Sequence, residues 1–196
     1  MFSPARWLSW TTLAALLVAL PASAAVPDPP KSTTSPILVG DSNGQLIQNG
    51  YEVWVRDLNN VPIAGSTVVL HFTGSARPYT SQVAPAIASC PTVSKITDAS
   101  GYVQFQVRMG GYDNVLATGV RVVADGVLLT NAVARSTDLT GDGATGAFDL
   151  VHFRNNFLNN PSAPETDYNK DGITDPFDFN IFRSVFLNDV PGTPCP

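Results

Sequence analysis

The C-terminal third of the chain contains the same loop pattern twice, at residues 138–149 and 167–178. In both copies an aspartate stands at positions 1, 5 and 12, a glycine at position 6 and a phenylalanine at position 11. The copies are offset by 29 residues, and each runs into a segment with helical apolar spacing. Aspartate and glycine are common in single turns, but two copies in phase predict a duplicated loop–helix unit.

The side chains of these loops predict that each loop binds one calcium ion. Calcium takes about six to eight oxygen ligands, and the glycine permits the sharp turn that gathers them. Both copies end in aspartate, whereas the general pattern for such loops ends in glutamate. In loop one (residues 138–149) the expected ligands are Asp138, Thr140, Asp142, the Ala144 carbonyl and Asp149. In loop two (residues 167–178) they are Asp167, Asn169, Asp171, the Ile173 carbonyl, Asp175 and Asp178.

The two loops differ in their number of ligands. Thr140 stands where loop two has an amide, and Gly146 offers no side chain at position 9. Calcium affinity depends on the number of charged ligands, so loop one is expected to bind more weakly. The sequence therefore predicts that loop two fills first in a calcium titration.

Apolar residues follow each loop at positions i, i+3 and i+7, which is the spacing of one helix face. They are Leu150, Phe153 and Phe157 after loop one, and Phe179, Phe182 and Phe186 after loop two. We expect these six side chains to form the joint core of a two-helix module. Phe148 and Phe177, at loop position 11, point elsewhere. Two alternatives are open for them: a partner surface, or packing back onto the rest of the protein.

A duplicated loop–helix unit with aspartate at position 12 resembles a type I dockerin, here over residues 136–190. The resemblance implies a module that binds two calcium ions and docks into a cohesin domain, usually within polysaccharide-degrading assemblies. In that family, loop positions 10 and 11 carry small hydroxyl residues that touch cohesin, and position 17 carries a basic residue. The corresponding residues here are Ala147, Phe148, Pro176 and Phe177, and, at the basic position, Arg154 and Arg183. The bulky rings would change the choice of partner.

A targeting signal at the N-terminus and an uneven distribution of charge indicate how the chain is divided into segments. Residues 1–24 combine Arg6, an apolar stretch and a small-residue cleavage site, which is typical of the signal peptide of a secreted protein. Residues 25–35 are expected to be a linker, and residues 191–196 a tail. The segment 136–196 carries nine acidic and three basic side chains, whereas the segment before it, from residue 25, carries seven of each. The acidity is therefore local to the loops, and it argues against a nucleic-acid partner.

Residues 36–135 contain short alternating apolar runs separated by turn residues, which predict strands with one buried face. Asp125–Gly126 is a hairpin signal, and residues 73–94 are expected to be a long connection. About seven short strands favour a β-sandwich. Residues 55–65 and 97–105 resemble bacterial immunoglobulin-like domains of the invasin or intimin type, which are spacers or adhesive modules. The expected fold class is mostly β, with an Ig-like β-sandwich followed by a small α module.

Cys90 and Cys195 lie in different predicted domains. In a secreted protein they can form one intrachain bridge, remain free thiols, or pair between chains. His71 and His152 lie near no nucleophile or metal motif, so no catalytic residue and no enzyme is predicted. Three functions compete: calcium-dependent docking to a cohesin-like or other extracellular protein, carbohydrate binding or adhesion by the sandwich, and an intramolecular calcium staple. No membrane span is expected in the mature chain.

Overall fold

The computed structural model describes residues 25–45 and 47–196, and the predicted signal peptide lies outside them. The described part of the chain is mostly β with two α-helices near its C-terminus, as the sequence predicts. Its strands are β1 (Thr33–Thr34), β2 (Ile37–Gly40), β3 (Tyr51–Trp54), β4 (Thr67–Phe72), β5 (Arg77–Pro78), β6 (Ile87–Ser89), β7 (Thr92–Ile96), β8 (Tyr102–Phe105), β9 (Met109–Gly110), β10 (Val120–Ala124) and β11 (Val127–Ser136). Its helices are the 3-10 helices η1 (Ile47–Asn49) and η2 (Pro164–Thr166) and the α-helices α1 (Ala147–Asn159) and α2 (Pro176–Leu187). No helix in the described part is long and apolar enough to cross a membrane.

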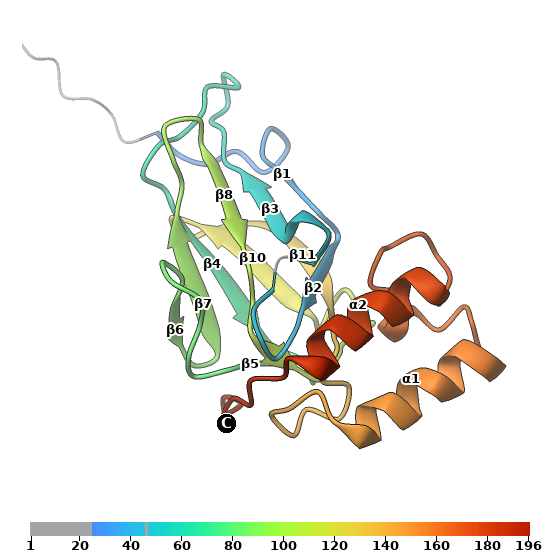
Figure 1. The fold of residues 1–196 in the computed structure, drawn as a ribbon. Helices are drawn as coiled ribbons and strands as arrows, with labels where there is room; N and C mark the ends of the chain where they lie inside the picture. Colours follow the sequence, from blue (N-terminus) through green and yellow to red (C-terminus); the bar gives the residue numbers. More distant parts are fainter. Residues whose placement is uncertain (1–24, 46) are drawn as a thin grey trace, which may run out of the picture.

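Two sheets enclose the core of the β region, which we define as residues 33–136 (Figure 1). One sheet has the order β1-β3-β8 and the other the order β2-β11-β10-β4-β7-β6, while β5 and β9 form a separate pair. β2 runs parallel to β11, and the other pairs of named strands are antiparallel. Residues alternate between the core and the surface, as in β3, where Tyr51 and Val53 are fully buried but Glu52 and Trp54 are not.

The observed strands agree with the sequence-based prediction where apolar and polar residues alternate over several positions. They differ from it where the strands are short. β4 and β10 lie within the region of predicted alternating strands, and the β10–β11 hairpin turns at Asp125 and Gly126, which both have positive φ. β1 lies inside the predicted linker, where Thr33 pairs with Trp54. β5, β6 and the start of β7 lie in the segment expected to be a connection. Strands of two or three residues carry too little alternation to be recognised in a sequence.

The helices α1 and α2 lie side by side at one end of the β region (Figure 1). Each begins where a loop ends. In α2, Asp175 accepts the N–H of Phe177, Asp178 accepts the N–H of Asp175, and Pro176 occupies the first turn, where its missing N–H is no loss. In α1, Asp149 likewise accepts a backbone N–H from the residue before the helix. The aspartate at loop position 12 therefore also starts each helix.

The helices and the β region share a second apolar core. Its fully or nearly buried members are Val39, Ile47, Leu139, Phe153, Tyr168 and Phe182. Because β2 and η1 contribute to this core, the helix pair packs against the β region as well as against itself.

The six helix residues expected in the core are buried to different degrees. Phe153 and Phe182 are buried, with ring centroids 5.1 Å apart. Leu150, Phe157 and Phe186 are partly buried against the same cluster. The prediction is wrong for Phe179, which is 40% exposed. Its ring still contacts that of Phe153, with centroids 6.0 Å apart, but Phe179 lies outside the buried cluster.

Cys90 and Cys195 are joined by a disulfide, so the structure contains the intrachain bridge among the three alternatives. The C-terminal strap (residues 189–196), which includes the predicted tail at 191–196, runs along the β region. The N–H of Thr80 donates to the carbonyl of Thr193 (2.9 Å), and the N–H of Cys195 donates to the carbonyl of Pro78 (2.8 Å). The strap thereby ties the end of α2 back to the strands.

Candidate metal centre

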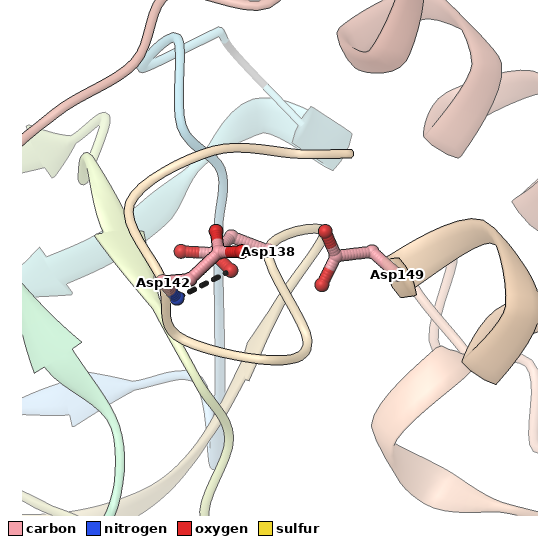
Figure 2. Close-up of side chains that lie close together, drawn as sticks. All are labelled: Asp138, Asp142 and Asp149. Carbon is pink, nitrogen blue, oxygen red and sulfur yellow. Dashed lines mark hydrogen bonds between the residues drawn. The ribbon is translucent and has the colours of Figure 1, made fainter. Parts of the chain in front are cut away.

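Loop one brings three carboxylates together at the start of α1. One oxygen from each of Asp138, Asp142 and Asp149 lies within 4.8 Å of the others. Figure 2 shows the carboxylate of Asp149 directed from the helix start toward Asp138 across the loop. Asp138 and Asp149 are buried, whereas Asp142 is exposed and leaves the cluster open to solvent. Three negative charges at this separation repel one another unless a cation lies among them.

Backbone amides hold the first carboxylate of loop one in place. Asp138 Oδ1 accepts the N–H groups of Gly141 (2.8 Å) and Asp142 (3.2 Å). Its Oδ2 accepts the N–H of Gly143 (3.0 Å). Gly143 has a φ of 104°, which residues with a side chain rarely adopt. The loop backbone therefore wraps around its own first residue and sets the direction of the carboxylate.

Burial disfavours the charged form of one carboxylate in each loop. It raises the pKa of Asp138 above the ordinary value, and the negative charge of Asp149 adds to that effect. Burial likewise raises the pKa of Asp178 in loop two. A nearby cation favours the charged form of a carboxylate, so both sites would gain from a positive ion.

Loop two repeats the backbone arrangement of loop one. Asp167 accepts the N–H groups of Asp171 (3.1 Å) and Gly172 (3.1 Å), as Asp138 does at the same positions. Within the described residues, however, three acidic groups converge to 4.8 Å only in loop one. Asp175, predicted as a ligand, accepts the N–H of Phe177 (2.7 Å) and serves as the N-cap of α2. The two loops therefore share a fold and differ in the arrangement of their carboxylates.

The other predicted ligands lie in equivalent places. The N–H groups of Ala144 and Ile173 donate to the aspartate at position 5 of their own loops, at 3.1 and 3.0 Å. At position 3, Thr140 Oγ1 lies 3.4 Å from the first aspartate of loop one. Asn169 Nδ2 instead donates to Asp171 Oδ2 (2.8 Å). Position 3 thus contacts a different carboxylate in each loop.

In each loop, the first aspartate is bound by one side chain that the sequence does not single out. Tyr79 Oη donates to Asp138 Oδ2 (2.6 Å). Arg135 Nη1 lies 3.0 Å from Asp167 Oδ2 and also donates to the Asp167 carbonyl (2.5 Å). Tyr79 is fully buried and Arg135 is 6% exposed. The sequence carries no signal for these contacts, because the partners are 59 and 32 residues apart.

Two threonine pairs brace the loops at positions that the repeat could have revealed. The hydroxyls of Thr137 and Thr145 are 3.0 Å apart, and those of Thr166 and Thr174 are 2.7 Å apart. All four residues are buried. Both members of each pair follow the offset of the loops, so the repeat begins one residue earlier than the ligands.

The residues expected at a partner surface are exposed. Phe148 and Phe177 are 76% and 68% exposed, so neither ring packs back onto the protein. The other expected contact residues are also exposed: Ala147, Arg154, Pro176 and Arg183. A depression of about 270 Å³ between the helices is lined by Leu150, Phe153, Arg154, Phe157, Pro176 and Phe179. We use the name outer helical face for four exposed apolar side chains of α1 and α2: Phe148, Val151, Phe177 and Phe179.

The donors gathered in loop one suit a hard cation. All three converging side chains offer carboxylate oxygen, which calcium and magnesium prefer, whereas zinc and copper favour nitrogen or sulfur. The two histidines lie outside the loops, His71 on β4 and His152 on α1. Comparisons of this chain with models of protein families, with curated proteins and with solved structures find no match.

Proposed function

We propose that this protein is a secreted, non-catalytic calcium-binding adaptor, built from an Ig-like β-sandwich and a dockerin-like module. The observation that carries the proposal is the convergence of Asp138, Asp142 and Asp149 in a loop whose backbone already orients its first carboxylate. The segment 136–196 has a net charge of −6, which two calcium ions would reduce to −2. The signal-peptide pattern of residues 1–24 supports secretion, where millimolar calcium is available to sites of modest affinity.

Calcium binding by the mature chain is the direct test. Calcium at about 100 times its dissociation constant should stabilise the fold by about 2.7 kcal/mol. For a protein of this size that corresponds to a rise in Tm of roughly 5–10 °C, measurable by calorimetry in calcium and in EDTA. Asp142→Asn removes one charge from loop one without opening the core, so the rise should become smaller. Asp28→Asn makes the same charge change outside the loops and should behave as wild type. Equal Tm values for wild type in calcium and in EDTA would contradict the proposal.

The outer helical face supports a protein partner. Phe148 and Phe177 occupy the same loop position, and both rings lie largely in solvent. Val151, about one turn further along α1, is 55% exposed, and Pro176 and Phe179 line the apolar depression between the helices. Large apolar side chains that are exposed to solvent are frequent at protein interfaces. Arg154, at the edge of the depression, adds a charge that an acidic residue of the partner could pair.

Partner binding is expected to require both calcium and the two rings. Immobilised wild-type protein should retain a partner from the secreted fraction of the producing organism in calcium and release it in EDTA. The double variant Phe148→Ser and Phe177→Ser should lose at least about tenfold in affinity, because truncating buried interface anchors costs about 2 kcal/mol or more. Leu58→Ser removes an equally exposed apolar residue from the β region and should have no effect. Retention of the same partner by the double variant would exclude the outer helical face as the interface.

The contacts between the loops and the β region favour a second candidate, an intramolecular calcium staple. Asp138 and Asp167 are bound by Tyr79 and Arg135 through buried groups, so calcium would also strengthen the junction between the helices and the strands. The two candidates differ in the capture experiment. A staple predicts calcium-dependent stability without any calcium-dependent partner.

A further inference from the structure

The first aspartate of each loop is bound at the same oxygen by a side chain of the β region. In loop one, Asp138 Oδ2 accepts the hydroxyl of Tyr79 together with the N–H of Gly143. In loop two, Asp167 Oδ2 accepts hydrogen bonds from Nη1 of Arg135 and from the N–H of Gly172. Both Oδ1 atoms are bound only by groups of their own loop: backbone amides in each case and, in loop one, also the hydroxyl of Thr140. In both loops, therefore, a side chain of the β region contacts Oδ2 of the first aspartate.

The two contacts differ in charge. The phenol of Tyr79 donates a hydrogen bond as a neutral group and leaves the carboxylate of Asp138 with its full charge. The guanidinium of Arg135 is always positive and pairs with Asp167 in a buried setting, where the side chains are 7% and 6% exposed. A buried pair is screened weakly by solvent and salt, so its positive charge acts on any cation nearby. Among the described residues, a basic side chain pairs with the first aspartate in loop two and not in loop one.

The net charges of the two loops favour the opposite order of calcium binding from the one that the number of ligands suggests. Loop one has three aspartates, and loop two has four aspartates and Lys170, so each loop by itself carries a net −3. Arg135 brings loop two to −2. Asp175 is further occupied as the N-cap of α2, and the acidic groups of loop two do not reach the convergence found in loop one.

We propose that Arg135 sets the order of calcium binding, so that loop one fills first and loop two fills at higher calcium concentration. This inference rests on the proposed calcium-binding function and identifies Arg135 as the residue that weakens the second site. Loop one would then be occupied over a wide range of calcium concentrations, whereas loop two would respond to changes in concentration. The order predicted from the number of ligands is the opposite one.

The two loops can be followed separately by NMR, because Gly143 and Gly172 each donate to the first aspartate of their own loop. In a calcium titration of the wild-type mature protein, the amide signal of Gly143 should reach its midpoint at lower calcium than that of Gly172. In Arg135→Gln, which keeps a hydrogen-bond donor without the charge, the Gly172 midpoint should fall at least about tenfold. The Gly143 midpoint should stay unchanged. Arg121→Gln removes the same charge from an exposed position on β10 and should leave both midpoints in place.

The outcomes distinguish a failure of the inference about Arg135 from a failure of the proposed calcium-binding function. If Gly172 saturates first in the wild type, the inference is overturned without any variant, even where Arg135→Gln fails to fold. An unchanged Gly172 midpoint in folded Arg135→Gln overturns the role of Arg135. If neither glycine responds to calcium, the calcium-binding function itself is rejected. A Gly143 midpoint below that of Gly172, with only the latter shifted by Arg135→Gln, supports the inference.

Discussion

Replacing Cys90 and Cys195 together by serine is expected to lower the free energy of unfolding by about 4–5 kcal/mol. The disulfide joins residues 105 apart in the sequence, and a long loop closed by a bridge loses much conformational freedom in the unfolded chain. For a protein of this size the loss corresponds to a Tm lower by roughly 10–15 °C. Calorimetry of the oxidised wild type and the double variant in the same buffer measures the difference.

The effect should extend to loop one, because the disulfide anchors the C-terminal strap. Asp189 Oδ1 accepts the N–H of Thr145 (2.9 Å), and the N–H of Gly192 donates to the carbonyl of Gly143 (2.7 Å). A strap released at its end holds these loop atoms less firmly, so the double variant should also bind calcium more weakly. Wild-type protein with its disulfide reduced provides the control and should match the double variant. A loss of stability below about 1 kcal/mol would show that the chain-entropy argument fails here.

Phe153→Ala is expected to destabilise the protein by about 3–5 kcal/mol, the usual range for removing a buried phenylalanine. Phe153 is 2% exposed, and its ring centroid lies 5.1 Å from that of Phe182 and 6.1 Å from that of Tyr168. Removing the ring leaves a cavity where α1, α2 and loop two meet the β region, and these packed elements can close it only in part. Urea unfolding followed by circular dichroism measures the change.

Phe148→Ala is the matched control, since it makes the same chemical change on the same helix at a residue that is 76% exposed. Its effect on the free energy of unfolding should stay within about 0.5 kcal/mol. Because the core around Phe153 includes Val39 of β2, the strands and the helices should lose structure together in Phe153→Ala. Similar stability of the two variants would mean that the second core contributes little to the fold.

The loops and helix starts were predictable because their determinants are local. The bonds from Asp138 to the amides of Gly141 and Gly143 span at most five residues, and Gly143 meets the need for positive φ within the same turn. The cap formed by Asp175 and Asp178 lies within a single helical turn. The apolar period of α1 and α2 places Phe153 and Phe182 in a core whichever surface completes it. The wrong expectation for Phe179 arose because periodicity gives a helix face and does not give the extent of its neighbour.

The sequence by itself therefore determined the mostly β character, the two loops with their glycine turns, and the helices that follow them. Only the tertiary structure decided which distant groups meet: Tyr79 with Asp138, Arg135 with Asp167, and the disulfide strap with loop one. Local patterns record the preferences of a few neighbouring residues, whereas these contacts depend on how sheets and helices fold over one another. That packing places a neutral donor behind one loop and a positive charge behind the other, and so makes two similar sequences into two different sites.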